Sequence, residues 1–259
     1  MTQSNNSIPA KRQQKIMEYL NAAESISIKE AAELCQVSEA TARRDLDDMA
    51  LAGYVERSHG GAVLHRGTGF EVIHAEKKKV MIPEKMRITK AAVEMICDGD
   101  SIFLDSGTTT YLLAERLASF KRLTVITNNL DIAYSIRLDP SSTMIVTGGI
   151  RRDGYSVLSG DIGEELIRKL CVDIIFLGAD AVDAKSGVFN SNFMEIGIKK
   201  SIVHSGKKKV LLADHKKFAQ QALAKVCDLE EFDCIITDDG ISDEDVKIMT
   251  RKVAQLIVV

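Results

Sequence analysis

The sequence predicts an α/β fold in two parts: a small N-terminal domain of short helices, and a larger C-terminal domain with a mostly parallel sheet flanked by helices. Closely spaced amphipathic helical patterns fill the first part of the chain, whereas apolar runs of strand length alternate with helical patterns from Ile102 onward. A stretch with two glycines, a lysine run and Pro83 separates the two textures. We therefore expect domains at residues 1–66 and 84–259, joined by a linker at 67–83.

The composition is that of an ordinary soluble globular protein. The 259 residues are 45% hydrophobic and 27% charged, and their number suits one large domain or two. Five scattered cysteines form no Cys-x-x-Cys pair, which indicates reduced thiols and no zinc site. The polar N-terminus lacks a secretory signal, and no apolar stretch approaches membrane-spanning length. We expect a cytoplasmic protein that binds no membrane, metal or cofactor.

The net charge of -3 argues at first against a nucleic-acid partner, because affinity for duplex DNA depends largely on lysine and arginine contacts to phosphate. The charge is unevenly divided, however. Residues 1–90 carry 14 Lys and Arg against 12 Asp and Glu, and residues 91–259 carry 20 against 25. The acidic surplus belongs to the larger domain, so the total does not exclude DNA binding by the smaller one.

The N-terminal domain is expected to contain three helices. An amphipathic pattern predicts the first at residues 12–21. Ser27-Ile28-Lys29-Glu30 is a capping box, which starts a second helix that ends near Cys35. Ser38 can cap a third helix at residues 39–52. A helix pair joined by so few residues is typical of a helix-turn-helix.

The third helix has one apolar face and one face suited to DNA. Its inward face is expected to hold Ala42, Leu46 and Met49. The opposite face presents Thr41, Arg43 and Arg44 early, with two aspartates a turn or more later. Because a recognition helix contacts base edges mainly through its N-terminal residues, this order favours insertion into the major groove. Arginine can donate to guanine edges or phosphate, and Ser38 and Thr41 can donate to phosphate. Taken alone, two exposed arginines are more often plain surface.

A hairpin after this helix is the predicted wing. Residues 54–57 and 62–64 flank a turn with two glycines. The whole module resembles the winged helix-turn-helix of the DeoR family of bacterial transcriptional regulators, at Val37-Ser38, Thr41, Arg43-Arg44-Asp45-Leu46, Gly53 and His59-Gly60-Gly61-Ala62. Ala42 departs from the family, which often has a larger aliphatic residue there. The resemblance implies DNA binding through Ser38, Thr41, Arg43, Arg44 and His59.

Seven apolar runs predict the sheet of the C-terminal domain. Because the runs are apolar on both faces, they suit a parallel sheet covered on both sides. They lie at residues 102–104, 124–126, 144–146, 174–177, 210–212, 234–236 and 256–259. Helical patterns at residues 110–118, 130–138 and 194–204 alternate with several of them, as in an α/β domain.

Polar residues follow almost every predicted strand, at the edge where open α/β sheets bind ligands. The most diagnostic segment is Ser106-Gly107-Thr108-Thr109, between a strand and a helix. Its glycine allows close backbone approach, and its hydroxyls and the helix amides favour an anion such as phosphate. The Gly-Lys-Ser/Thr signature of a nucleoside triphosphate loop is absent.

This half also resembles the DeoR family, whose effector domain is similar in fold to ribose-5-phosphate isomerase. The resemblance implies that Ser106, Gly107, Thr108 and Thr109 hold a phosphate with help from Lys217. It implies that Asp105, Asn128, Asp180 and Glu195 face the hydroxyls of a sugar, and that Lys199 adds charge. Gly149, from another strand end, completes the expected ligand-binding set.

The function predicted is a regulator that binds operator DNA as a homo-oligomer, dimer or tetramer. It is expected to be a repressor of a carbohydrate catabolism or transport operon that responds to a phosphorylated sugar. A sugar-phosphate isomerase-like enzyme fused to a DNA-binding module is the alternative, since Glu195 stands where isomerases place a carboxylate. Residues 186–193 lack the Lys-Gly-Gly-Gly run of those enzymes, which favours binding without turnover. A third possibility is a constitutive DNA-binding protein whose α/β half serves only oligomerisation.

Overall fold

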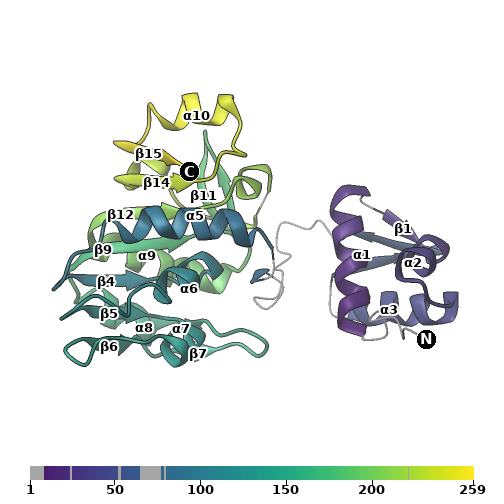
Figure 1. Cartoon of the computed structure of the whole chain (residues 1–259), viewed down its shortest axis with the longest axis horizontal. Helices are drawn as coiled ribbons and strands as arrows, with labels where there is room; N and C mark the ends of the chain where they lie inside the picture. Colours follow the sequence, from purple (N-terminus) through teal and green to yellow (C-terminus); the bar gives the residue numbers. More distant parts are fainter. Residues whose placement is uncertain (1–8, 24, 52–53, 65–76, 79, 221) are drawn as a thin grey trace. The chain divides into compact units, whose positions relative to one another are not determined.

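The chain forms two compact units, with the division between residues 70 and 71 (Figure 1). The computed structural model describes residues 9–23, 25–51, 54–64, 77–78, 80–220 and 222–259. Gly53 and most of the linker expected at 67–83 lie outside the described residues. Among the residues described, no helix is long and apolar enough to cross a membrane.

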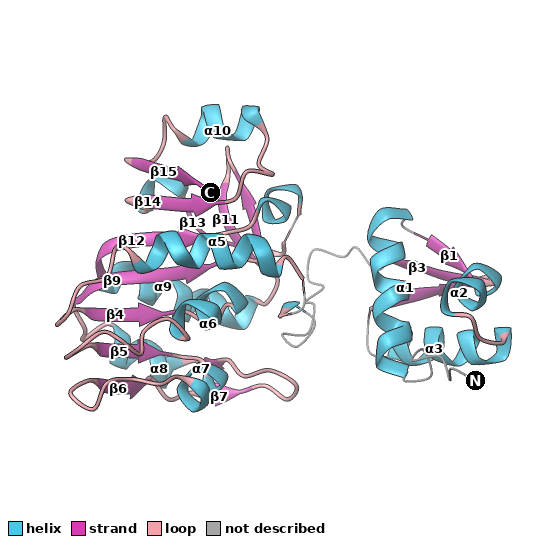
Figure 2. Ribbon diagram, viewed as in Figure 1, coloured by secondary structure: helices cyan, strands magenta, loops and turns pink. Residues whose placement is uncertain are grey.

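The described part of the N-terminal unit consists of three helices and a small antiparallel sheet (Figure 2). In chain order these are α1 (Pro9–Ala23), β1 (Ser25–Ser27), α2 (Ile28–Cys35), α3 (Glu39–Leu51), β2 (Val55–Ser58) and β3 (Gly61–Leu64). The capping box at Ser27 and Glu30 is confirmed, as is the start of α3 directly after Ser38. The third strand, β1, was not expected; it pairs with β3, so β3 is the central strand of the sheet and β2 lies at one edge.

One apolar cluster holds this unit together. Ala42, Leu46 and Met49 of α3 are buried as predicted, against Ile16 and Leu20 of α1. Full burial of each larger aliphatic side chain contributes roughly 1.5–3 kcal/mol. Ala42 lies in this core with no exposed surface. The position at which the chain departs from the family pattern is therefore a packed core position that holds a smaller residue.

The C-terminal unit is built on a seven-stranded sheet with the order β15-β14-β12-β9-β4-β5-β6. Every neighbouring pair in it is parallel, and all seven predicted runs are strands of this sheet. The bounds are β4 (Ser101–Leu104), β5 (Thr124–Thr127), β6 (Thr143–Val146), β9 (Val172–Gly178), β12 (Gly206–Leu212), β14 (Cys234–Thr237) and β15 (Gln255–Val258). The fold class predicted from the sequence is therefore confirmed.

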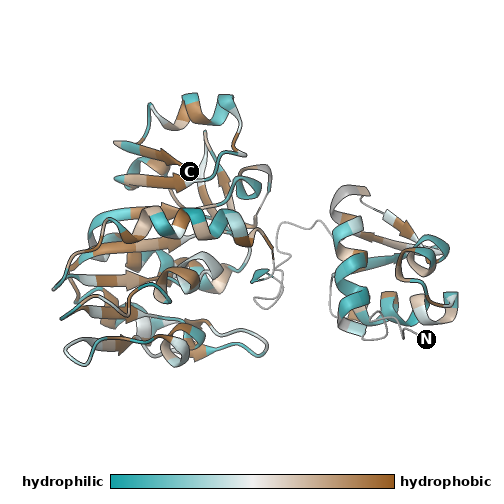
Figure 3. Cartoon of the chain, viewed as in Figure 1, coloured by the Kyte–Doolittle hydropathy of each residue, from teal (hydrophilic) through white to brown (hydrophobic). Residues whose placement is uncertain are grey.

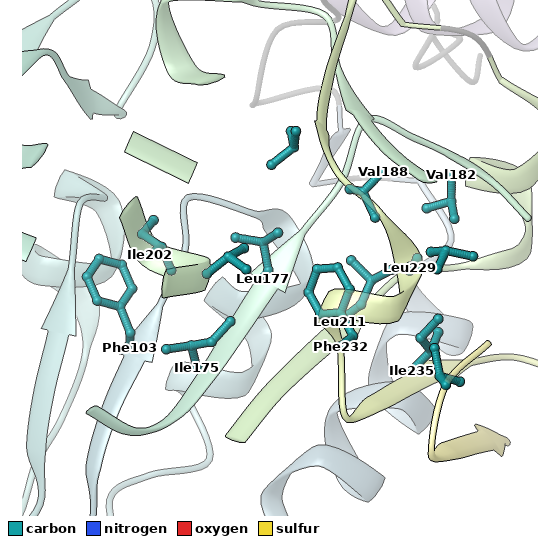
Figure 4. Close-up of a cluster of buried hydrophobic side chains, with 14 of the residues drawn as sticks. Phe103, Ile175, Leu177, Val182, Val188, Ile202, Leu211, Leu229, Phe232 and Ile235 are labelled. Atoms are coloured by element: carbon teal, nitrogen blue, oxygen red, sulfur yellow. The ribbon is translucent and has the colours of Figure 1, made fainter. Parts of the chain in front are cut away.

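Helices cover both faces of the sheet, so successive strand residues enter different cores. Phe103 packs with Ile175 and with Ile202 of α9 on one face (Figure 4), whereas Ile102 packs with Leu113 of α6 on the other. The strands are correspondingly hydrophobic along their length (Figure 3). The helices are α5 (Ile82–Val93), α6 (Thr108–Ala114), α7 (Leu130–Ser135), α8 (Asp161–Ile167), α9 (Ile196–Ser205) and α10 (Asp243–Met249), with 3-10 turns at Phe193–Glu195, His215–Ala219 and Leu229–Glu231.

Several elements differ from the sequence expectation. The helix expected at 110–118 begins earlier and ends at Ala114, and the helix expected at 130–138 ends at Ser135. Pro83 stands in the first turn of α5, where a missing amide hydrogen costs nothing, so a helix begins inside the expected linker. Two small sheets were not anticipated: β10 (Ala181–Asp183), β11 (Gly187–Asn190) and β13 (Ala224–Cys227) form one, and β7 (Ile150–Arg151) and β8 (Leu158–Ser159) form the other.

The strand order contains a topological switch between β4 and β9. The chain proceeds from β4 to β5 and β6 on one side, and later places β9 against the opposite edge of β4. The connections that leave the carboxyl ends of these two strands diverge, which opens a crevice between them. This crevice positions the candidate ligand site.

Candidate nucleic-acid interface and ligand pocket

The N-terminus of α3 presents the residues predicted to meet DNA. Arg43, Arg44, Ser38 and His59 are exposed, and Thr41 is half-buried. The Ser38 hydroxyl accepts a hydrogen bond from the Thr41 amide at 3.2 Å and lies 2.9 Å from the Thr41 hydroxyl. Ser38 therefore caps the helix, and the two hydroxyls are held together at its first turn. His59 stands in the two-residue turn between β2 and β3, where Gly60 has a φ of 92°.

A buried ion pair, which the sequence reasoning missed, fixes α3 against α1. Arg12 Nε and Nη2 donate to the two carboxylate oxygens of Asp45 at 2.6 and 2.7 Å. Their side chains are 8% and 3% exposed. Because Asp45 is adjacent to Arg44 and Leu46, this bidentate contact sets which face of the recognition helix points outward. The sequence marks Asp45 only as part of the family motif, and nothing in its local pattern identifies a partner 33 residues away.

A second ion pair ties the wing to the same helix. Arg57 of β2 lies with its Nε 2.8 Å from an Asp47 carboxylate oxygen and also donates to the carbonyl of Gly61. Asp47 therefore positions the hairpin in addition to standing late in the helix. The pair is partly exposed, so its contribution to stability is small and its contribution to geometry is the larger one.

In the C-terminal unit, Asp105 is buried at the switch point between β4 and β9. It follows β4, has no exposed surface, and accepts hydrogen bonds from Lys199 Nζ at 2.5 Å and from the Gly178 amide at 3.0 Å. Gly178 is the last residue of β9. Lys199 also donates to the Gly178 carbonyl at 3.2 Å. Asp105 and Lys199 thus join the ends of β4 and β9 to helix α9 and form the floor of the crevice.

The predicted anion loop lines a pocket above this floor. Ser106, Gly107, Thr108 and Thr109 are all among the lining residues. Gly107 caps α6, and the Thr110 hydroxyl accepts a hydrogen bond from the Gly107 amide at 2.9 Å. The first amides of a helix have no partner within it, so the loop offers amide and hydroxyl donors at one place.

The opposite wall of the pocket carries mixed charges from three other strand ends. Asp180 follows β9, Glu195 precedes α9, and Asp214 and Lys217 follow β12. Glu195 accepts hydrogen bonds from the Asn190 and Asn192 amides at 3.2 and 2.9 Å. In the described part of the chain, the Asp214 Oδ1 atom is buried without a hydrogen-bond partner, which marks it as an acceptor available to a ligand.

Neighbouring charges keep two buried groups ionised. Burial opposes ionisation of Asp180, but Lys77 and Lys217 outweigh it and hold the pKa of this carboxyl well below its usual range. Burial likewise opposes the charged form of Lys199, yet the charge and hydrogen bond of Asp105 raise the pKa of this ammonium. Both groups are therefore charged at neutral pH.

The charged forms of two further buried lysines are disfavoured, and their pKa values are lowered. Burial, and then the charge of Lys77, lowers the pKa of Lys217 despite the opposing pull of Asp214. Burial lowers the pKa of Lys85 to about 8, with Lys217 and Lys77 acting in the same direction. Of these two lysines, Lys217 lines the pocket, and an anion placed beside it would favour its charged form, so the pocket is electrostatically suited to a phosphate.

Three residues of the expected ligand set do not line the pocket. Asp105 is buried beneath it, and the other two, Asn128 and Gly149, are placed elsewhere. Asn128 is fully buried, and its amide donates to the Leu158 carbonyl at 3.3 Å. Gly149 has a φ of 125°, and a Cβ at this position would lie 2.6 Å from the Ser159 carbonyl oxygen. Neither is among the pocket-lining residues, and both serve the packing of the β7–β8 hairpin.

The pocket also contains residues that the expected set omits, notably Lys77, Tyr155, Asn190 and Asp214. Strand-end position could have identified Asp214. A run of lysines such as the one that contains Lys77 and Lys78 usually indicates solvated surface, but these two lysines are not fully solvated. Their side chains are only 20% and 32% exposed, and each forms an ion pair with the C-terminal unit. Among the described residues, no group of three or more His, Cys, Asp or Glu side chains could hold a metal ion.

A winged helix-turn-helix followed by an α/β unit with a charged pocket at its switch point defines a class: transcriptional regulators with a ligand-sensing domain. The comparisons identify the family within it. Residues 12–68 match the DeoR-like helix-turn-helix domain, and residues 81–239 match the DeoR C terminal sensor domain. The chain belongs to the DeoR family.

Curated relatives match along almost the whole chain. The HTH-type transcriptional regulator GlpR of Haloferax volcanii is 32% identical over 92% of this chain and 92% of that protein. The glycerol-3-phosphate regulon repressor of Haemophilus influenzae is 31% identical over 88% of this chain and 89% of its own length. Among solved structures, ribose 5-phosphate isomerase A from Methanocaldococcus jannaschii is similar at a TM-score of 0.35 and 21% identity, over 51% of this chain and 52% of that one. A likeness of this size carries no residue role over to the present chain.

Proposed function

We propose that this regulator represses a carbohydrate catabolism or transport operon and leaves its operator when a phosphorylated sugar or polyol occupies the pocket. The observation that carries the proposal is the pocket itself: a loop with a glycine and three hydroxyl groups, a nearby lysine and several carboxylates meet at the switch point of a DeoR sensor domain. The name of the Haemophilus influenzae relative, a repressor of a glycerol-3-phosphate regulon, supports a phosphorylated ligand.

For the operator, the proposed contacts are Arg43 and Arg44 to base edges or phosphate, Ser38 and Thr41 to phosphate, and His59 from the wing. The exposure of both arginines supports this assignment. Operators are usually read by symmetric oligomers, so we propose a homo-oligomer with paired recognition helices. A DNA-binding regulator acts where the chromosome is, and we propose a cytoplasmic location.

For the effector, we propose that Ser106, Gly107, Thr108, Thr109 and Lys217 bind the phosphate. Asp180, Glu195 and Asp214 then accept hydrogen bonds from the hydroxyl groups of the sugar or polyol. Asp105 and Lys199 support the pocket from below, because they form an ion pair at 2.5 Å that neutralises the charge of each. We expect this arrangement to select compounds that have both a phosphate and several hydroxyl groups.

We propose that the pocket binds without turnover. An isomerase needs a base that moves a proton between adjacent carbons. Glu195 is tied down by two asparagine amides. Lys185, the nearest lysine in the sequence to the position of the missing isomerase cation, is exposed, lies 3.6 Å from Glu244, and is not among the pocket-lining residues. Conversion of ribose, fructose, galactitol or amino-sugar phosphates at enzyme-like rates would overturn this part of the proposal.

A thermal-unfolding screen of the full chain tests the effector class. The panel contains glycerol 3-phosphate and phosphates of ribose, fructose, galactitol and amino sugars, each paired with its unphosphorylated form. A ligand at about one hundred times its Kd stabilises the native state by about 2.7 kcal/mol, and only phosphorylated members are expected to do so. Stabilisation by unphosphorylated sugars to the same extent, or by no member of the panel, contradicts a phosphorylated effector.

A further inference from the structure

A hydrogen-bonded histidine–aspartate pair joins the turn after β12 to the end of β14. His215 Nδ1 lies 2.6 Å from the Asp238 Oδ2 atom, and the backbone amide of His215 donates to Asp238 Oδ1 at 2.7 Å. The Gly240 amide donates to the same carboxylate at 3.1 Å. The Asp238 side chain is 1% exposed. Neither His215 nor Asp238 is among the pocket-lining residues, and neither has a part in the proposed function.

The direction of donation within this pair is fixed, and so is the place of the ring. Burial opposes ionisation of Asp238, but the hydrogen bonds from His215 and Gly240 outweigh it and lower the pKa of this carboxyl. An ionised carboxylate only accepts hydrogen bonds, so Nδ1 of His215 carries the proton. A Cβ at position 240 would lie 2.4 Å from His215 Nδ1, so the imidazole fits there because Gly240 has no side chain.

Residues on both sides of His215 line the pocket. Asp214 directly precedes it, and Lys217 follows in the same 3-10 turn. The Lys217 amide donates to the Asp214 carbonyl at 2.9 Å, but the Asp214 side chain does not cap the turn. Among the residues described, its buried Oδ1 atom has no hydrogen-bond partner. Asp238, at the end of the neighbouring strand, therefore supplies the carboxylate that holds this turn, and Asp214 is left to face a ligand.

We propose that His215 and Asp238 are positioning residues for the effector: their hydrogen bonds hold the turn at residues 214–217 so that Asp214 and Lys217 face the ligand together. This inference rests on the proposed function, because it requires a phosphorylated ligand in the pocket. Groups that are already held in place lose less conformational freedom on binding than mobile groups do. Loss of the bond between Nδ1 and Oδ2 therefore weakens binding, although no group that touches the ligand has been removed.

Two substitutions of His215 separate positioning from packing. His215→Asn keeps a donor near the place of Nδ1 in a smaller side chain, whereas His215→Leu keeps most of the volume and has no donor. Calorimetric titration of the full chain uses inorganic phosphate and the phosphorylated compound that most stabilises the unmodified protein. Both affinities should fall about tenfold in His215→Leu and less than about threefold in His215→Asn, because a hydrogen bond to a charged group is lost only in the first. His204→Leu is the matched control, since His204 is exposed and does not line the pocket.

Gly240→Ala breaks the same pair without changing either partner. It displaces the imidazole ring, so it should weaken both ligands about as much as His215→Leu does. Asp239→Asn, at an exposed carboxylate next to Asp238, should bind both ligands as the unmodified protein does. Operator affinity without ligand should be the same in every variant, which shows that each chain folds.

The outcomes distinguish this inference from the proposed function. Equal weakening in His215→Asn and His215→Leu, or unchanged affinity in His215→Leu, would overturn the positioning role and leave the proposed function standing. If the unmodified chain binds neither inorganic phosphate nor any phosphorylated compound of the panel, the proposed function and the positioning role both fail.

Discussion

Replacement of Asp45 by Ala tests whether the Arg12–Asp45 pair sets the recognition helix. The substitution leaves a guanidinium 8% exposed without the carboxylate that accepts the hydrogen bonds from its Nε and Nη2 atoms. Removing one partner of a buried pair costs about 3–5 kcal/mol. A domain of about 60 residues is stable by roughly 3–9 kcal/mol, at 0.05–0.15 kcal/mol per residue. The variant should therefore lose most of the stability of its N-terminal unit.

Differential scanning calorimetry of the full chain measures this loss, because we expect each of the two compact units to contribute its own unfolding transition. The transition of the N-terminal unit should fall by more than about 10 °C, while that of the C-terminal unit stays in place. Asp48→Ala is the matched control, since Asp48 is exposed on the same helix. The double substitution Arg12→Met with Asp45→Leu should recover much of the stability, because two apolar side chains leave no buried charge. A loss below about 1 kcal/mol for Asp45→Ala would refute the structural role of the pair.

Three further outcomes are expected. Arg44→Ala should weaken operator binding about 10- to 100-fold in fluorescence anisotropy without changing thermal stability. The control Arg137→Ala, at another exposed arginine, should have no effect on operator binding. Loss of folding in Arg44→Ala would contradict the outward orientation of this side chain. Thr108→Asp places a carboxylate against the phosphate and should abolish ligand-induced stabilisation while operator binding persists, and Thr143→Asp on the sheet edge should leave both intact; a Thr108→Asp chain that still responds would move the phosphate site elsewhere. Because the pKa of Lys85 is lowered to about 8, the unfolded chain binds more protons than the folded chain above pH 8. The free energy of unfolding of the original protein, measured relative to Lys85→Met, should therefore rise by about 3 kcal/mol between pH 8 and 10.5. A difference that stays constant over this range would show that Lys85 does not titrate in it.

Local chemistry was sufficient to predict most of the fold. Ser27 and Glu30 satisfy each other's helix-start amides within four residues, so the capping box could be read directly from the sequence. Runs apolar on both faces are confined to strands covered on both sides, and all seven became one parallel sheet. The short strands of the two small sheets lack such a run. They are strands because they pair with other segments of the chain, and local sequence patterns do not reveal that pairing.

From the residues alone, pocket-lining positions were predictable only where they follow a strand; Glu195, Lys199 and Lys217 were reached through the family resemblance. Ser106 to Thr109 and Asp180 lie where the strand-end rule places them, but Asn128 obeys the same rule and is instead hydrogen-bonded to Leu158. Lys77 could not be found by any local signal, because its partner Asp180 is 103 residues away and a lysine run resembles solvated surface. Long-range pairing of charges decides such positions, and a single sequence does not display it.

In the proposed regulator, binding of operator DNA and binding of a phosphorylated ligand each weaken the other. The most direct measurement is operator affinity of the full chain with and without the stabilising phosphate, together with affinity for that phosphate with and without operator. Linkage requires the two factors to be equal, and we expect both affinities to fall by the same factor, about 5- to 150-fold. An operator affinity that no phosphorylated sugar or polyol changes would contradict the claim.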